Sequence, residues 1–284
     1  HPRQGHPMSP STASTPLGGY WLATHRPLQS LYFLLPLLAV YELGTVLLSL
    51  QGDATTQRIL AEAFLKQFFS VFGFASVHLP AITVVVVLLA WHLARRKQRD
   101  PVAPQWRTLI GMLAESLILT LPLFVLQLLT QRAMYSPGGG ESLSMVLQAV
   151  TGSTSASGTA GTSGNAAGWA SQLLLSFGAG IYEELVFRLL GIAVLGLLLE
   201  DVLALPRAWA GLIAVAVSSL AFAWYHFWGT GAPIAPGLFA FYAIAGVYFA
   251  GVYVLRGFGI VVAVHAFYDV LIVSAPLLAS RGSG

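Results

Sequence analysis

The sequence has no cysteine and few charged side chains. Only 9% of its 284 residues are charged, whereas soluble domains carry about 25%. The lack of cysteine excludes disulfides, zinc held by thiolates and a cysteine nucleophile, and it leaves the redox compartment undetermined. The lack of charge, with 56% hydrophobic residues, indicates a chain that has a lipid bilayer as its solvent.

The beginning of the chain lacks the apolar core of a signal peptide. Residues 1–29 are polar and rich in Pro, Ser and Thr, so we expect a disordered polar tail there. The net charge is only +3, which gives no reason to expect a nucleic-acid partner.

Apolar runs long enough to cross a bilayer fill most of the remaining chain. A crossing needs about 20 apolar residues. We therefore predict an all-α, multi-pass transmembrane helical bundle with about seven membrane helices. The runs are roughly 30–50, 77–94, 108–129, 168–193, 208–227, 237–255 and 258–279.

Two further stretches resemble helices that lie in the membrane interface. In 55–73, Leu60, Phe64, Phe68 and Phe72 recur every four residues among charged residues. This spacing suits an interfacial helix, and a helix packed on the bundle explains it equally well. The second stretch is 194–206.

A Gly/Ser/Thr-rich segment divides the membrane region. Residues 151–167 are predicted to be a flexible loop. It separates N-terminal helices (30–150) from C-terminal helices (168–280). We expect one membrane domain over 30–280, because four helices alone would leave polar groups facing lipid.

The distribution of Lys and Arg predicts the orientation. The loop after the second run holds Arg95, Arg96, Lys97, Arg99 and Arg107. Its side of the membrane would carry nine basic residues, against four on the other side. By the positive-inside rule we expect a protein of the cell (inner) membrane with a cytoplasmic N-terminus and an extracytoplasmic C-terminus.

A few ionisable residues interrupt the apolar runs. Such groups are costly in a bilayer and usually mark function. They are Glu42, Glu115, Glu183, Glu184, Arg188 and Asp269.

Two adjacent glutamates lie in the run 168–193. Glu184 and Arg188 are four residues apart and can pair on one helix face. Glu183 is turned away by about 100° and must face another helix or water, which suits a general acid or base. The structural alternative is a buried polar knot that locks helix packing.

Two histidines follow on later helices. His226 shares a helix face with Phe222, and His265 shares one with Asp269, which can orient its ring. The structural alternatives are an interfacial histidine and a satisfied core pair.

Three motifs in these segments resemble the CAAX-protease and bacteriocin-processing family (CPBP, also called Abi) of intramembrane proteases, which includes the type II CAAX prenyl endopeptidases. The family motifs are EExxxR, FxxxH and HxxxN or HxxxD. They stand here as Glu183-Glu184-Leu185-Val186-Phe187-Arg188, Phe222-Ala223-Trp224-Tyr225-His226 and His265-Ala266-Phe267-Tyr268-Asp269.

The resemblance implies a multi-pass membrane endopeptidase. Its partners would be membrane lipid and a membrane-associated protein or peptide substrate, with the oligomeric state undetermined. Glu183 and His226 would activate a water, and His265 and Asp269 would stabilise the oxyanion or position the water. Glu184 and Arg188 would support them. Asp269 stands where the prenyl endopeptidases usually have Asn, and an ionised Asp cannot donate to an oxyanion.

No cofactor is expected to be required. Zinc bound by Glu183, His226 and His265 is the alternative.

Other functions have weaker support in the sequence. The GxSG match at residues 161–164 lies in the low-complexity loop, so we discount a rhomboid-type serine protease. An ion- or proton-coupled transporter would use the same buried carboxylates. A bacteriocin-immunity scaffold would keep the fold without cleaving.

Two further expectations concern geometry. Glu42 should face the bundle and support the polar cluster. Glu183, His226 and His265 should converge, although upright helices would place His265 about 10 Å and His226 about 27 Å from the same membrane side.

Overall fold

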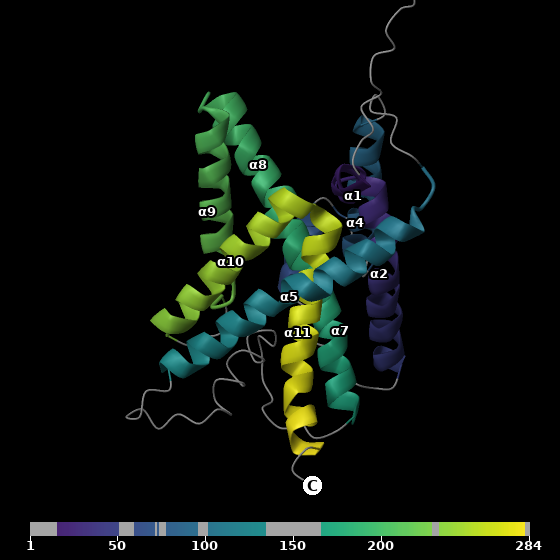
Figure 1. Cartoon of the computed structure of the whole chain (residues 1–284), viewed down its shortest axis with the longest axis vertical. Helices are drawn as coiled ribbons and strands as arrows, with labels where there is room; N and C mark the ends of the chain where they lie inside the picture. The colour runs from purple at the N-terminus through teal and green to yellow at the C-terminus, as the bar shows by residue number, and fades with distance from the viewer. Residues whose placement is uncertain are drawn as a thin grey trace, which may run out of the picture.

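The computed structural model describes residues 16–50, 60–71, 73, 78–95, 102–134, 166–228 and 233–281, and these residues contain no strand. The all-α class is therefore confirmed. The elements are α1 (Pro16–Thr24), α2 (Pro27–Leu50), α3 (Leu60–Val71), α4 (Leu79–Ala94), α5 (Trp106–Met134), α7 (Ala166–Glu184), the π-helical η2 (Leu185–Gly191), α8 (Ile192–Gly196), the π-helical η3 (Leu197–Val202), α9 (Arg207–Tyr225), α10 (Pro236–Arg256) and α11 (Phe258–Arg281) (Figure 1).

Five helices in the described part of the chain are long and apolar enough to cross a membrane, namely α2, α5, α9, α10 and α11. The run 77–94 forms the shorter apolar helix α4, and the run 168–193 is divided among α7, η2 and α8. Large apolar side chains point outward from these spans, such as Leu43, which is 65% exposed, and Ile110, which is 66% exposed. So large an exposed apolar surface is not stable in water, so the chain is a multi-pass membrane protein.

Helix α11 occupies the centre of the bundle. It packs against α7, α5, α10 and α2, and α2 also contacts α7 and α4. In Figure 1, α7 and α11 run side by side in the lower half, while α9 stands in the upper half. The N-terminal helices thus share one hydrophobic core with residues 166–281.

We expected residues 1–29 to be a disordered tail. This expectation is wrong for residues 16–29, because residues 16–24 form α1 and α2 begins at Pro27. The Tyr20 hydroxyl donates to Glu115 Oε2 at 2.7 Å. Arg256 also hydrogen-bonds Glu115, and its guanidinium lies 3.6 Å from the centre of the Trp21 ring. These contacts fix α1 to the bundle. Residues 1–15 of the tail, and 151–165 of the predicted loop, lie outside the described residues.

Helix α3 packs on the bundle, which is one of the two arrangements that its sequence left open. Ala61, Glu62 and Leu65 are buried. Glu62 accepts a hydrogen bond from the Tyr41 hydroxyl and lies 2.7 Å from Lys66 Nζ. Phe68 on another face is 58% exposed. The helix therefore packs on the bundle by one face and offers aromatic side chains outward.

Helices α7 and α11 approach most closely at Gly180. A Cβ there would lie 2.7 Å from the Val262 carbonyl oxygen and 2.9 Å from the Ala266 amide nitrogen. We expect Gly180→Ala to force the helices apart and to destabilise the fold by about 1–3 kcal/mol. Thermal unfolding in detergent measures the effect. Gly211→Ala is the matched control, because a Cβ at Gly211 meets nothing within 4 Å; equal melting temperatures for the two variants would contradict the expectation.

Candidate active site

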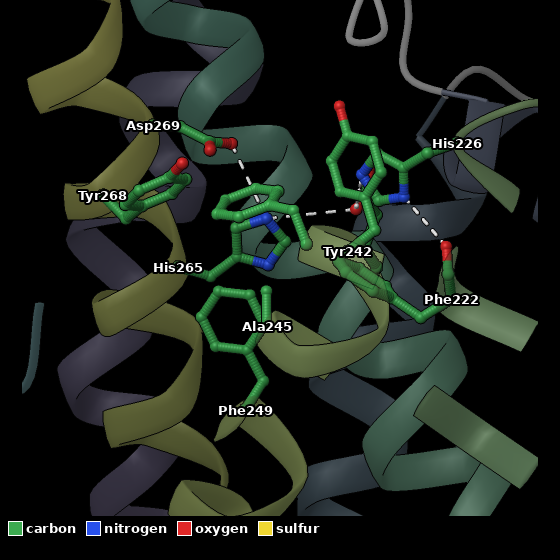
Figure 2. A pocket seen from close by; sticks show the side chains of 10 residues that line it. Phe222, His226, Tyr242, Ala245, Phe249, His265, Tyr268 and Asp269 are labelled. Atoms are coloured by element: carbon green, nitrogen blue, oxygen red, sulfur yellow. Dashed lines mark hydrogen bonds and ion pairs between the residues drawn. The ribbon is translucent and has the colours of Figure 1, made fainter. Parts of the chain in front are cut away.

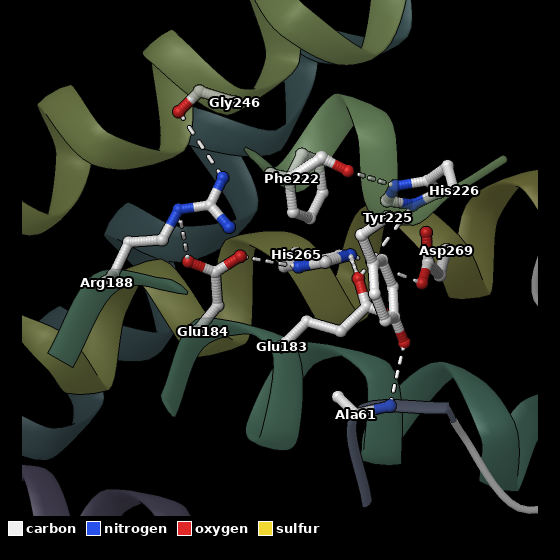
Figure 3. Close-up of polar contacts among 10 residues, drawn as sticks. All are labelled: Ala61, Glu183, Glu184, Arg188, Phe222, Tyr225, His226, Gly246, His265 and Asp269. Carbon is white, nitrogen blue, oxygen red and sulfur yellow. Dashed lines mark hydrogen bonds and ion pairs between the residues drawn. The ribbon is translucent and has the colours of Figure 1, made fainter. Parts of the chain in front are cut away.

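Three helices and one π-helical turn bring the candidate residues together. Glu183 and Glu184 end α7, Arg188 lies in η2, His226 directly follows α9, and His265 lies on α11 (Figure 3). Glu184 and Arg188 are fully buried, and Glu183 and His265 are 3% and 4% exposed. The π-helix begins at the residue after the glutamates, as π-helical turns often do at functional sites.

Glu184 joins Arg188 to His265. As the spacing predicts, Arg188 Nε lies 3.1 Å from Glu184 Oε2. The other carboxylate oxygen, Oε1, lies 2.7 Å from His265 Nδ1. A carboxylate ionised beside an arginine can only accept, so His265 Nδ1 carries a hydrogen. The ring of His265 is therefore oriented by a glutamate at the end of α7.

Asp269 faces the other edge of that ring. Asp269 Oδ2 lies 3.6 Å from Nε2, the other ring nitrogen of His265. Asp269 Oδ2 makes no hydrogen bond with the described residues. Asp269 thus faces the reactive edge of His265, while Glu184 holds the opposite edge.

Aromatic rings enclose Arg188 and support His265. The guanidinium carbon of Arg188 lies 4.2 Å from the centre of the Phe222 ring and 5.3 Å from that of Phe249. Phe249 in turn stacks on His265, with ring centres 4.5 Å apart and planes inclined by 19°. Contacts between a cation and an aromatic face are strongest where water is excluded. The same rings therefore stabilise the buried cation and fix the plane of His265.

His226 is fixed by its own helix and by α10. Its Nδ1 lies 2.8 Å from the Phe222 carbonyl oxygen. Because a carbonyl only accepts, Nδ1 carries the hydrogen, and Nε2 of the neutral ring has a free lone pair. Tyr242 stacks on the ring with a centre distance of 4.0 Å. Nε2 points toward Glu183 (Figure 3).

Glu183 is the point at which the two histidines meet. Its Oε2 lies 3.9 Å from His226 Nε2 and 3.9 Å from His265 Nε2. The structure thus brings together the three residues expected to converge. The expected conflict of depth does not arise, because α9 and α11 lie at different heights (Figure 1) and the end of α9 meets the second turn of α11.

A cavity of about 30 Å³ lies against these side chains, which is large enough for a water molecule. Glu183 Oε2 and Asp269 Oδ2 are buried and form no hydrogen bond within the described part of the chain. Buried oxygens normally have a partner, so a water in the cavity can supply hydrogen bonds to these two. The cavity is lined by Glu183, Phe222, His226, Phe241, Tyr242, Ala245, Phe249, His265, Tyr268 and Asp269 (Figure 2).

A bound metal ion is the alternative that the sequence leaves open. Among the described residues, no group of three or more His, Cys, Asp or Glu side chains is arranged to hold one. The closest set is the one named from sequence, Glu183, His226 and His265. In that set each histidine nitrogen stands 3.9 Å from the glutamate oxygen. We therefore derive no step through a metal.

Glu42 faces the bundle, as expected, with a side chain 16% exposed. Its Oε1 accepts a hydrogen bond from Tyr182 at 3.0 Å, and its Oε2 lies 2.9 Å from His78 Nδ1. Tyr182 precedes Glu183 in the chain, so Glu42 supports α7 beside the site and does not contact Glu183 itself.

Three aromatic residues of the site were not found from the sequence. Tyr225 contacts Glu183, Tyr242 stacks on His226, and Phe249 stacks on His265. Aromatic side chains are common in apolar helices, so Tyr242 and Phe249 carried no distinguishing signal. Tyr225 stood beside His226 within a recognised motif.

Comparison with known protein families identifies this region. Residues 165–271 match the family model described as Type II CAAX prenyl endopeptidase Rce1-like. This part of the chain belongs to that family. The match includes Glu183, Glu184, Arg188, His226, His265 and Asp269. The comparisons with curated proteins and with solved structures gave no match.

The Rce1-like region therefore contains every polar side chain that lines the cavity. Helices α2, α3 and α5 pack against it. At the level of the family, this region is that of a CAAX-type intramembrane protease.

Proposed function

We propose that this protein is an endopeptidase that hydrolyses a peptide bond of a membrane-associated protein with a water activated by Glu183 and His226. The observation that carries the proposal is the position of Glu183 Oε2, which faces Nε2 of both histidines at 3.9 Å beside a buried cavity.

Glu183 Oε2 and His226 Nε2, the two atoms expected to activate water, can both accept a hydrogen bond from a water in the cavity. A separation of 3.9 Å between Glu183 Oε2 and His226 Nε2 is too long for a direct hydrogen bond but suits a bridging water. A water there donates one hydrogen to each group and turns a lone pair toward the substrate carbonyl. As the water attacks, its proton passes to one of these bases, which then supplies a proton to the departing amine.

His265 is placed to stabilise the oxyanion. Its Nδ1 hydrogen is committed to Glu184. Its Nε2 lies between Asp269 Oδ2 at 3.6 Å and Glu183 Oε2 at 3.9 Å, and two carboxylates favour a proton on that nitrogen. Nε2–H can then donate to the negative oxygen that forms on the substrate. Asp269 contributes by sustaining the positive charge of His265, since an ionised carboxylate has no hydrogen to donate.

The substrate class follows from the family and from the site. The matched family is described as prenyl endopeptidases, so we propose prenylated proteins as candidate substrates. We also propose that the N-terminus is cytoplasmic, that the active site works without a metal, and that zinc-bound water is the alternative mechanism.

The proposal is tested with purified full-length protein in vesicles that also carry a library of lipid-anchored peptides. We expect the wild type to cleave peptides internally. The cleavage rate should fall by about 100- to 10,000-fold in His226→Phe, because this variant keeps an aromatic ring beside Tyr242 but removes the acceptor nitrogen. Mass spectrometry of the products measures both. Cleavage should persist in a zinc chelator; activity lost to the chelator and restored by zinc would favour the metal-bound alternative.

An uncleaved library would contradict the proposal and favour one of the other two functions. Proton flux across the same vesicles then tests the transporter. A protein that neither cleaves nor moves protons would fit the immunity scaffold.

A further inference from the structure

The hydroxyl of Tyr225, the last residue of α9, lies between the candidate base and a helix from the N-terminal half of the chain. It donates to Glu183 Oε1 at 3.2 Å and accepts from the Ala61 amide of α3 at 2.9 Å (Figure 3). Tyr225 is only 8% exposed. The mechanism above gives this residue no role.

The direction of both hydrogen bonds is fixed by chemistry. A backbone N–H can only donate, so the Tyr225 oxygen accepts from Ala61 and has its single hydrogen left for Glu183. Oε1 of Glu183 is therefore committed as an acceptor. Oε2, the oxygen that faces both histidines, is then the oxygen better placed to take up a proton during hydrolysis.

The ring of Tyr225 is held from several sides. Its centre lies 5.2 Å from that of Phe187 and 5.3 Å from that of His226, and Phe64 of α3 is 6.3 Å away. These edge-on contacts prevent the phenol from swinging away from Glu183. The same ring connects α3 to the site.

We infer that Tyr225 is a positioning residue, which α3 holds through Ala61 and which fixes the Glu183 carboxylate with Oε2 directed at His226 and His265. The inference rests on the proposed function, because it assigns Tyr225 a part in the same hydrolysis.

The test is Tyr225→Phe in the full-length protein, assayed on the best-cleaved lipid-anchored peptide of the library. Loss of a hydrogen bond to a charged group should lower kcat about 10- to 100-fold and leave KM within about twofold. Tyr20→Phe is the matched control, because it also removes a phenol that donates to a carboxylate, here Glu115 at 2.7 Å, far from the cavity. A kcat unchanged in Tyr225→Phe, or lowered equally in Tyr20→Phe, would overturn the inference.

A second measurement needs no substrate. Infrared difference spectra of wild type and Glu183→Gln isolate the carboxylate band of Glu183. The frequency of this band should shift in Tyr225→Phe and remain unchanged in Tyr20→Phe. An unchanged frequency in Tyr225→Phe also overturns the inference. If the wild type cleaves no peptide, the proposed function fails, and the band alone then decides whether Tyr225 holds Glu183.

Discussion

Glu183→Gln is expected to abolish peptide cleavage while leaving the fold intact. The amide oxygen of Gln can still accept the Tyr225 hydrogen bond at the position of Oε1. The group that faces the histidines at 3.9 Å then becomes an amide, which cannot take a proton from water. Removal of a general base costs about 100- to 10,000-fold in rate, and we expect kcat to fall by that factor.

The measurement is cleavage of a lipid-anchored peptide by the purified variant, with melting temperature recorded on the same sample. Glu200→Gln is the matched control. It makes the same chemical change at a glutamate whose side chain is 35% exposed and lies 3.7 Å from Arg207. Substantial activity in Glu183→Gln, with a correct fold, would remove Glu183 from the mechanism.

Arg188→Leu is expected to be the most destabilising single substitution in the site. Arg188 and Glu184 are both fully buried and 3.1 Å apart. When one partner of a buried ion pair is removed, the other is left as an uncompensated charge, at a cost of about 3–5 kcal/mol. The loss of the cation between Phe222 and Phe249 adds to this cost. Unfolding in mixed micelles measures the change in free energy.

A double variant separates stability from catalysis. Glu184→Gln combined with Arg188→Leu leaves no unpaired charge, so part of the lost stability should return. Activity should not return, because His265 Nδ1 then lacks the anionic partner that lies 2.7 Å away. The exposed pair Glu200 and Arg207, changed in the same way, should alter stability by less than about 1 kcal/mol. Equal destabilisation by the exposed and the buried pair would show that burial does not set the cost.

Hydrophobicity and the spacing of residues on a helix were sufficient to predict much of the structure. Long apolar runs in a chain with few charges leave helices as the only elements that satisfy the backbone in lipid. That constraint gave the all-α class and the positions of five of the seven predicted spans. Residues four apart meet on a helix face whatever lies around them. The pairing of Glu184 with Arg188 and the contact of Phe222 with His226 followed from this local geometry.

Contacts between helices distant in sequence could not be read in the same way. Asp269 lies four residues after His265 and faces its Nε2, as the spacing predicts, but the spacing gave no sign that Glu184 of α7 hydrogen-bonds Nδ1 of the same ring. This contact depends on how α7 and α11 are rotated against each other, and the close approach at Gly180 is part of that packing. The helix over residues 16–24 was not expected for a similar reason. The polar residues before the first span gave no sign that the Tyr20 hydroxyl hydrogen-bonds Glu115.

The sequence by itself determined that this is a membrane protein, which residues are too polar for their helices, and which motifs they form. These properties depend on composition and on the helical repeat. Only the tertiary structure decided that Glu183 Oε2 faces two histidines, that Glu184 holds His265, and that Tyr225 links Glu183 to α3. The reason is physical, since the stagger and rotation of packed helices are set by many weak contacts along their whole length.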